Sequence, residues 1–209
     1  MKDCRQFWNM RAQNYDEVIG PAYAAAYDKT VSNTLKYLKP EDRVLEFACG
    51  TGIVTLPVAQ KVSHVRAIDI SDEMVLRLQK KVAEQQIPNL EVSRTDLFDP
   101  CLEPGSFDAV LAFNVLCYVE NFEEVMARIS QLLKPGGLFL SATDCLAQTY
   151  SKVAVQKFWR SRRGKMPYVA FFTNRRLEQK IQGAGFAVLE RENLFPAPAN
   201  LFVAARKER

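Results

Sequence analysis

One stretch, residues 43–52 with the sequence RVLEFACGTG, constrains the possible fold of this chain more than any other. Its apolar first half predicts a short buried strand, which breaks into a turn made of the smallest side chains. Apolar residues then return at helical spacing over residues 53–60. A strand, a small-residue turn and a helix are typical of an α/β sheet that presents backbone N–H groups to a ligand. Gly50 and Gly52 can adopt positive φ and let a ligand lie against the main chain.

Two nucleotide-type interpretations compete for this turn. The dinucleotide fingerprint G-x-G-x-x-G requires a glycine where this chain has Thr55, so that turn is incomplete. The stretch instead resembles motif I of the class I S-adenosylmethionine-dependent methyltransferases, (D/E)-x-x-x-G-x-G, which begins here at Glu46. Ala48 stands where many members have a first glycine, and we expect a tighter turn there. A tight turn that binds no ligand is the third interpretation at this point.

Length and composition indicate one ordinary globular domain. The chain has 209 residues, 48% of them hydrophobic and 25% charged, and no apolar run reaches the ~20 residues that span a bilayer. No signal peptide is evident, and five scattered cysteines without a C-x-x-C pair favour reduced thiols. We therefore expect a cytoplasmic protein without membrane segments, disulfides or zinc. A single histidine, His64, leaves little for a metal site or a His-dependent triad.

Two further motifs match the same family in the expected order. Residues 133–137, LKPGG, predict a tight turn into the fifth strand, with two glycines where side chains would clash. Residues 184–186, AGF, end a helix and start the sixth strand. The resemblance covers roughly residues 40–205. It implies an α/β fold with a Rossmann-like, doubly wound, seven-stranded sheet in the order 3-2-1-4-5-7-6, strand 7 being antiparallel.

The chain is expected to form a single methyltransferase domain, residues 1–209, in four parts. An N-terminal helical cap (1–39) precedes the cofactor-binding core (40–144), and a lid for the acceptor (145–172) precedes the last helix and strands six and seven (173–209). The aromatic-rich residues 7–16 come before the first convincing helix, expected at residues 22–38.

Local patterns place the other elements. Apolar runs predict strands at residues 65–69, 90–94, 106–114, 138–140, 186–191 and 201–205. Helical spacing predicts helices at residues 71–86, 121–133 and 174–182, with N-caps at Ser71, Asn121 and Thr173.

Asp69 is the first candidate for the cofactor site. It ends the second strand, 17 residues after Gly52. A carboxylate has two oxygens that can accept hydrogen bonds from both hydroxyls of a ribose. Dinucleotide-binding folds use the same device, so Asp69 indicates a ribose without identifying the cofactor. The alternative is an ordinary exposed aspartate at a strand end.

The resemblance implies further contacts with S-adenosylmethionine. Asp96 would lie beside the adenine amino group with Leu97 against the ring, and the alternative for Asp96 is a capping residue of its own turn. Tyr15 matches a tyrosine that closes the cofactor pocket. The complete set of expected cofactor-binding residues is Tyr15, Glu46, Ala48, Cys49, Gly50, Gly52, Asp69, Ile70, Met74, Asp96, Leu97, Asn114 and Val115.

The end of the fourth strand bears on the acceptor. Methyltransferases that act on amino groups of nucleic acids carry (D/N)-P-P-(Y/F/W) there, and residues 114–117, NVLC, lack both prolines. Adenine or cytosine amino methylation is therefore disfavoured. If the acceptor needs a general base, Tyr118 and Asp144 are the catalytic candidates.

The lid, residues 145–172, mixes basic and aromatic side chains and suggests an acidic or aromatic acceptor. Its alternative is a solvated amphipathic helix whose aromatic side faces the core. The net charge of +4 is mild and requires no nucleic acid.

The resulting hypothesis is an S-adenosylmethionine-dependent methyltransferase that transfers a methyl group to a small-molecule acceptor by in-line displacement. No metal is implied. An RNA methyltransferase and a catalytically silent cofactor-binding module remain as alternatives, and the sequence predicts neither the acceptor nor the oligomeric state.

Overall fold

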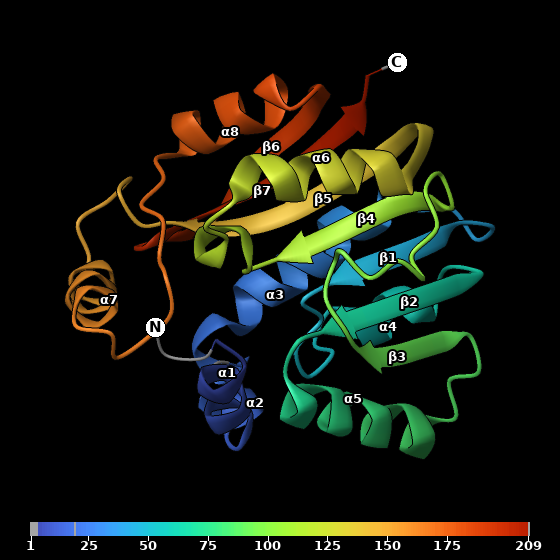
Figure 1. The fold of residues 1–209 in the computed structure, drawn as a ribbon, viewed down its shortest axis with the longest axis horizontal. Helices are drawn as coiled ribbons and strands as arrows, with labels where there is room; N and C mark the ends of the chain where they lie inside the picture. Colours follow the sequence, from blue (N-terminus) through green and yellow to red (C-terminus); the bar gives the residue numbers. More distant parts are fainter. Residues whose placement is uncertain (1–3, 19, 209) are drawn as a thin grey trace.

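A seven-stranded sheet in the order β3-β2-β1-β4-β5-β7-β6 forms the centre of the molecule (Figure 1). The computed structural model describes residues 4–18 and 20–208. Along this order, each adjacent pair of strands from β3 to β5 is parallel. Strand β7 is antiparallel to both of its neighbours, β5 and β6. The predicted fold class, strand order and antiparallel seventh strand are therefore confirmed.

The strands follow the predicted apolar runs, but the last three are longer than predicted. Their bounds are β1 Arg43–Phe47, β2 His64–Asp69, β3 Leu90–Arg94, β4 Phe107–Phe113, β5 Leu133–Cys145, β6 Phe186–Pro196 and β7 Ala199–Lys207. In β6 the exposed and partly buried residues outnumber the buried ones, so an apolar pattern marks only part of this edge strand.

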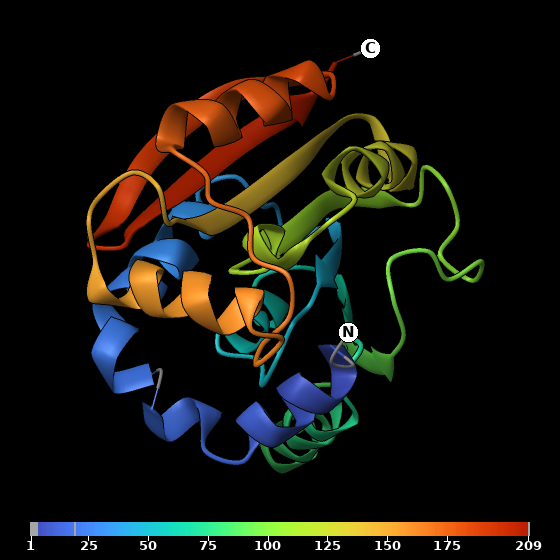
Figure 2. The same cartoon turned by 60° about the vertical axis from the view of Figure 1, so that its left-hand side comes forward.

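Helices cover both faces of the sheet (Figures 1 and 2). One buried cluster joins the sheet to α6 and α8, and the other joins it to α3, α4 and α5. The helical elements are α1 Cys4–Ala12, α2 Tyr15–Val18, α3 Gly20–Leu35, α4 Thr55–Ala59, α5 Asp72–Gln85, the 3₁₀ turn η1 Leu116–Tyr118, α6 Phe122–Leu132, α7 Lys152–Arg162 and α8 Asn174–Gly183.

Two of the three predicted N-caps form the expected hydrogen bond. Ser71 accepts from the backbone N–H of Met74, and Thr173 accepts from that of Arg176, both at 3.2 Å. Asn121 occupies the N-cap position of α6 but makes no such bond. Its side-chain amide instead donates a hydrogen bond to the Glu124 carboxylate at 2.7 Å.

The expectation that residues 7–16 precede the first helix is wrong, because α1 and α2 are helices. Within α1 only Phe7 and Ala12 are buried, so the segment lacks a strong helical pattern. Its position depends on tertiary contacts with α5: Arg5 pairs with Asp72 at 2.6 Å, and the Asn9 side chain accepts from the Ser71 hydroxyl at 2.6 Å. These contacts hold α1 against the start of α5.

The LKPGG segment lies within the bounds of β5, and its two glycines have different roles. Gly136 has φ +72°, and a Cβ added there would meet nothing within 4 Å, so this glycine is needed for backbone conformation. A Cβ on Gly137 would lie 3.0 Å from the Lys134 carbonyl and 3.1 Å from that of Asp108. The predicted clash therefore applies to Gly137 alone.

Gly52 should be among the most sensitive glycines to substitution. It has φ +86°, and an added Cβ would lie 2.2 Å from Cδ1 of the fully buried Leu78. We expect Gly52→Ala to lower the free energy of unfolding by about 2–4 kcal/mol, measured by urea denaturation, through backbone strain plus overpacking. Gly105→Ala is the matched control, because Gly105 has φ +65° with nothing within 4 Å. Equal losses in the two variants would contradict a packing role for Gly52.

Candidate active site

The carboxyl ends of β1 to β4 meet at one edge of the sheet, next to α1, α2 and α7 (Figures 1 and 2). A cavity of about 280 Å³ lies there, as ligand sites do in open α/β sheets. Among the predicted cofactor residues, those that line it are Tyr15, Ala48, Gly50, Asp69, Ile70, Met74, Asp96, Leu97, Asn114 and Val115.

The turn after β1 forms the floor of this first cavity. Ala48 and Gly50 both have positive φ, 59° and 56°. An added Cβ at Gly50 would meet nothing within 4 Å, so its backbone is open to a ligand. Gly52 does not line this first cavity, and its Cα instead faces the side chain of Leu78.

Asp69 is buried, in contrast to the exposed aspartate that the sequence left open. Its two carboxylate oxygens accept hydrogen bonds from the backbone N–H groups of Gly50 at 2.9 Å and Ser71 at 2.8 Å. Burial raises the pKa of this carboxyl, and the backbone donors oppose that rise. The two bonds fix the carboxylate at the cavity wall, where each oxygen retains further accepting capacity.

Glu46 and Cys49 lie beside the first cavity, around a small space of about 40 Å³ that also touches Tyr15 and Gly50. Burial raises the pKa of the Glu46 carboxyl to about 8, and the charge of Asp69 adds to the rise. Oε2 of Glu46 has no hydrogen-bond partner within residues 4–18 and 20–208. Burial also raises the pKa of the Cys49 thiol, so a thiolate is disfavoured there.

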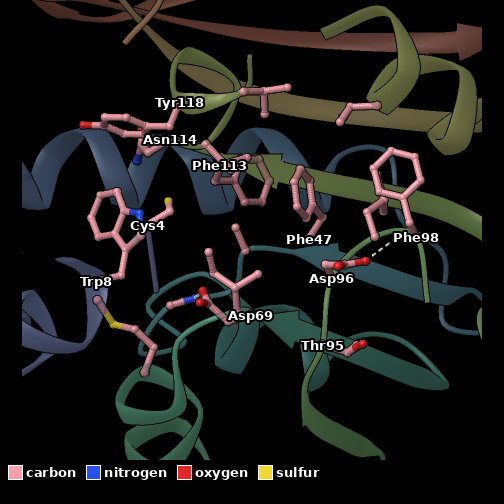
Figure 3. Close-up of a pocket in the computed structure, with 18 of the residues that line it drawn as sticks. Cys4, Trp8, Phe47, Asp69, Thr95, Asp96, Phe98, Phe113, Asn114 and Tyr118 are labelled. Atoms are coloured by element: carbon pink, nitrogen blue, oxygen red, sulfur yellow. Dashed lines mark hydrogen bonds between the residues drawn. The ribbon is translucent and has the colours of Figure 1, made fainter. Parts of the chain in front are cut away.

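Near Asp96, Phe47 and Phe98 line the first cavity (Figure 3). Asp96 accepts a hydrogen bond from the Phe98 backbone N–H at 2.7 Å, the capping interaction that the sequence allowed, and it lines the cavity as well. Leu97 is buried, whereas Phe98 is 47% exposed at the rim. Phe47 and Phe98 were not predicted as site residues, although each adjoins a predicted one in the sequence.

A second cavity of about 330 Å³ adjoins the first. The two share Trp8, Tyr15, Asn114 and Tyr118. Around the second cavity are residues from α1, α2, α3, the end of β4, η1, β5, α7 and β7: Trp8, Arg11, Tyr15, Val18, Tyr23, Ala26, Tyr27, Thr30, Asn114, Tyr118, Asp144, Val153, Lys157 and Asn200. Tyr27, Asn200 and Arg11 were not predicted, because nothing near them in the sequence forms a motif.

A polar network occupies one wall of this second cavity. The Lys157 ammonium pairs with Asp144 at 2.8 Å. The Asn200 amide donates to Asp144 at 3.0 Å and to the side-chain oxygen of Asn114 at 2.8 Å. Both oxygens of Asp144 thus accept a hydrogen bond within this network, which holds the carboxylate in place.

Tyr118, the other predicted base, lies between the two cavities. Burial raises the pKa of its hydroxyl above the usual range. The Lys157 ammonium lies 5.3 Å from the centre of the Tyr118 ring, within the range of a cation–π contact. Burial works against the Lys157 charge, but the Asp144 carboxylate beside it outweighs burial and raises the pKa of Lys157. Tyr118 is therefore protonated at neutral pH.

Helix α7 lies within the predicted lid and contributes Val153 and Lys157 to the second cavity. Trp159 is 53% exposed, whereas the Phe158 ring lies 5.6 Å from that of Phe171, which packs against a buried cluster, so the aromatic side chains of α7 face the core only in part. Within the described ranges no group of three or more His, Cys, Asp or Glu residues could hold a metal ion. No helix in the same ranges has the length and apolar character of a membrane span.

Comparisons with known proteins agree with this geometry. Residues 21–191 match a family described as a methyltransferase domain. The chain is 37% identical over 108 residues to a ubiquinone biosynthesis O-methyltransferase of Xanthomonas campestris, covering 50% of this chain and 44% of that protein. It is 33% identical over 102 residues to the nocamycin O-methyltransferase of Saccharothrix syringae, covering 47% of this chain and 36% of that protein. The chain thus spans about half the length, or less, of these curated relatives.

A solved structure shares the fold across the whole chain. Phosphoethanolamine N-methyltransferase 2 of Haemonchus contortus, in complex with phosphomonomethylethanolamine and S-adenosylhomocysteine, superposes with a TM-score of 0.80 at 17% identity. The match covers all of this chain and 61% of that protein. The sheet order found here is thus set in a fold shared with a solved methyltransferase. The chain belongs to the methyltransferase domain family matched over residues 21–191.

Glu46 should make stability depend on pH. Because its pKa rises from 4.5 to about 8 on folding, its favourable contribution is complete below pH 4.5 and is lost as pH rises towards about 8. We expect urea denaturation to show the free energy of unfolding falling over that range relative to Glu46→Gln. The raised pKa of Asp69 also lowers the free energy of unfolding as pH rises, but it does so in both proteins. The difference between their unfolding free energies therefore reports on Glu46. Parallel pH curves would contradict the buried, protonated state.

The Lys157–Asp144 pair should behave as a buried couple, since their side chains are only 19% and 20% exposed. Lys157→Met leaves a buried carboxylate without its cation, and we expect it to cost about 3 kcal/mol of unfolding free energy. Adding Asp144→Asn should restore most of that loss. A double-mutant cycle by urea denaturation measures the coupling, and simple additivity of the two changes would show that the pair is not coupled.

Proposed function

We propose that this chain transfers a methyl group from S-adenosylmethionine to a small-molecule acceptor. The observation that supports this most is the junction of two cavities at Trp8, Tyr15, Asn114 and Tyr118. The first has the acidic groups and open backbone suited to a nucleoside cofactor. The second, about 330 Å³ and bounded by tyrosines and a polar network, has the size of a small-molecule site.

The residues of the first cavity fit the cofactor. Asp69, held by two backbone donors, would accept from the ribose hydroxyls. Beside this cavity, Glu46 has a buried side-chain oxygen without a partner among the described residues, and the cofactor's ammonium group would pair with it and favour its ionised form. Asp96, Leu97 and Phe98 would hold the adenine between a carboxylate and two apolar side chains.

When bound, S-adenosylmethionine would supply a methyl group attached to a positively charged sulfur. The sulfur leaves readily as a neutral thioether when the methyl group is transferred. The chain then mainly needs to align the acceptor and exclude water. Tyr118 is protonated and between the cavities, so it would donate a hydrogen bond or shape the wall rather than remove a proton. Asp144, through Asn200, orients Asn114 and is better suited to positioning than to general-base catalysis.

A small acceptor also suits the relatives. The ubiquinone and nocamycin O-methyltransferases, and the phosphoethanolamine N-methyltransferase, are named for small-molecule acceptors. The missing (D/N)-P-P-(Y/F/W) motif favours the same choice over nucleic-acid amino groups. If RNA were the acceptor, binding would fall steeply with salt, and weak salt dependence would exclude it.

Calorimetric titration with S-adenosylhomocysteine tests the cofactor site, with NAD as the comparison ligand. We expect micromolar binding of the first and none of the second. Asp69→Ala should weaken S-adenosylhomocysteine binding by about 1–3 kcal/mol, the scale of a lost hydrogen bond to a charged group. Unchanged affinity would remove Asp69 from the ribose role.

Asp108→Ala is the matched control for this experiment. Asp108 also accepts a backbone N–H, that of Arg43 at 2.9 Å, and it pairs with Lys134 at 2.6 Å. It lies at the opposite end of β4 from the cavity. Its substitution should leave the affinity unchanged, and a loss equal to that of Asp69→Ala would point to general destabilisation.

A further inference from the structure

We propose that the second cavity selects acceptors that carry an anionic group, a carboxylate or a phosphate, and that Arg11 and Arg160 bind this group. The inference rests on the proposed function, because it assigns the acceptor class of the same site. Several basic side chains lie near this cavity, and these two are the ones available to a ligand.

A third cavity of about 190 Å³ extends the acceptor space. It shares Trp8, Arg11, Tyr118, Val153 and Lys157 with the second cavity. Its remaining lining residues are Phe7, Gln156, Arg160 and Met166. The extension therefore lies between α1 and α7, the two helices that Figure 2 shows at the open side of the sheet.

The cations around this space differ in their partners. Lys157 is paired with Asp144 and so is already neutralised. Arg162 and Arg163 lie over the rings of Phe158 and Trp159, at 5.3 and 5.6 Å, and line neither cavity.

Arg11 and Arg160 are different. Neither forms an ion pair with any of the described residues. Asp144 is the single acid in the described lining of the two cavities, and Lys157 already occupies it. Two guanidinium groups therefore face shared space without a counterion from those residues, and a guanidinium fork matches a carboxylate or phosphate.

Position supports the same assignment. Arg11 is close enough to Tyr15 for its charge to lower the pKa of that hydroxyl, against a larger rise from burial. Tyr15 lies at the junction of the cofactor and acceptor cavities. An acceptor anchored at Arg11 and Arg160 would thus direct its other end toward Asn114 and Tyr118. The walls between combine aromatic side chains, notably Trp8, with the polar network around Asp144.

The test uses benzoate, phenyl phosphate and the neutral benzamide as probes, with saturation-transfer NMR on the full chain. We expect the anions to bind at least about tenfold more tightly than benzamide, as a charge-assisted hydrogen bond predicts. Arg11→Gln and Arg160→Gln should each weaken the anions about tenfold and leave benzamide unchanged. The preferred anion identifies carboxylate or phosphate as the acceptor's group.

Arg162→Gln is the matched control, since it removes a cation from α7 outside both cavities. Equal weakening by Arg162→Gln, equal binding of benzamide, or no anion binding would overturn the proposal. If Arg11→Gln proves unfolded by circular dichroism, Arg11→Lys and the exposed Arg160→Gln decide instead.

The outcome separates this inference from the proposed function. Each titration is run with and without S-adenosylhomocysteine, whose own affinity is measured in every variant. If the anions do not bind selectively but S-adenosylhomocysteine binds, only the proposed acceptor class is overturned. Absent S-adenosylhomocysteine binding with selective anion binding overturns the methyl-transfer proposal and leaves the anion site standing.

Discussion

The hydrogen bonds from the backbone of Gly50 and Ser71 to the Asp69 carboxylate connect the parts on which the site depends. They join the end of β2 to the turn after β1 and to the start of α5. Because the carboxylate is buried, losing either donor would leave it poorly solvated, so the three segments are held in one arrangement. The floor of the cofactor cavity therefore exists before any ligand binds.

The sequence predicted the centre of the fold well because its signals are local. Buried parallel strands are continuous apolar runs, and Ser71 and Thr173 cap helices through bonds to residues three positions later. The strand order came from the family resemblance alone. Helix α1 escaped prediction because it is stabilised by residues more than sixty positions away, such as Ser71 and Asp72. The edge strand β6 was predicted short because much of it faces solvent.

The site was predictable where a functional side chain stands at or just after a strand end, as Asp69 and Asp96 do. It was not predictable where function depends on distant neighbours. Tyr118 and Asp144 are plausible bases by residue type, but burial of Tyr118 and the engagement of Asp144 by Lys157 and Asn200 change what they can do. Only the folded chain brings these groups together, so composition and spacing could not reveal the network.

Trp8 lines all three cavities, and this has a consequence for how ligands influence one another. Its helix contacts α5 through the Arg5–Asp72 pair, whose side chains are 49% and 41% exposed, and through the hydrogen bond from the Ser71 hydroxyl to Asn9. A ligand that packs against Trp8 in one cavity stabilises the docked helix and so reduces the ordering cost for a ligand in another. If the cavities hold cofactor and acceptor as proposed, the two ligands are linked thermodynamically through α1, with positive cooperativity that requires no rearrangement of the sheet.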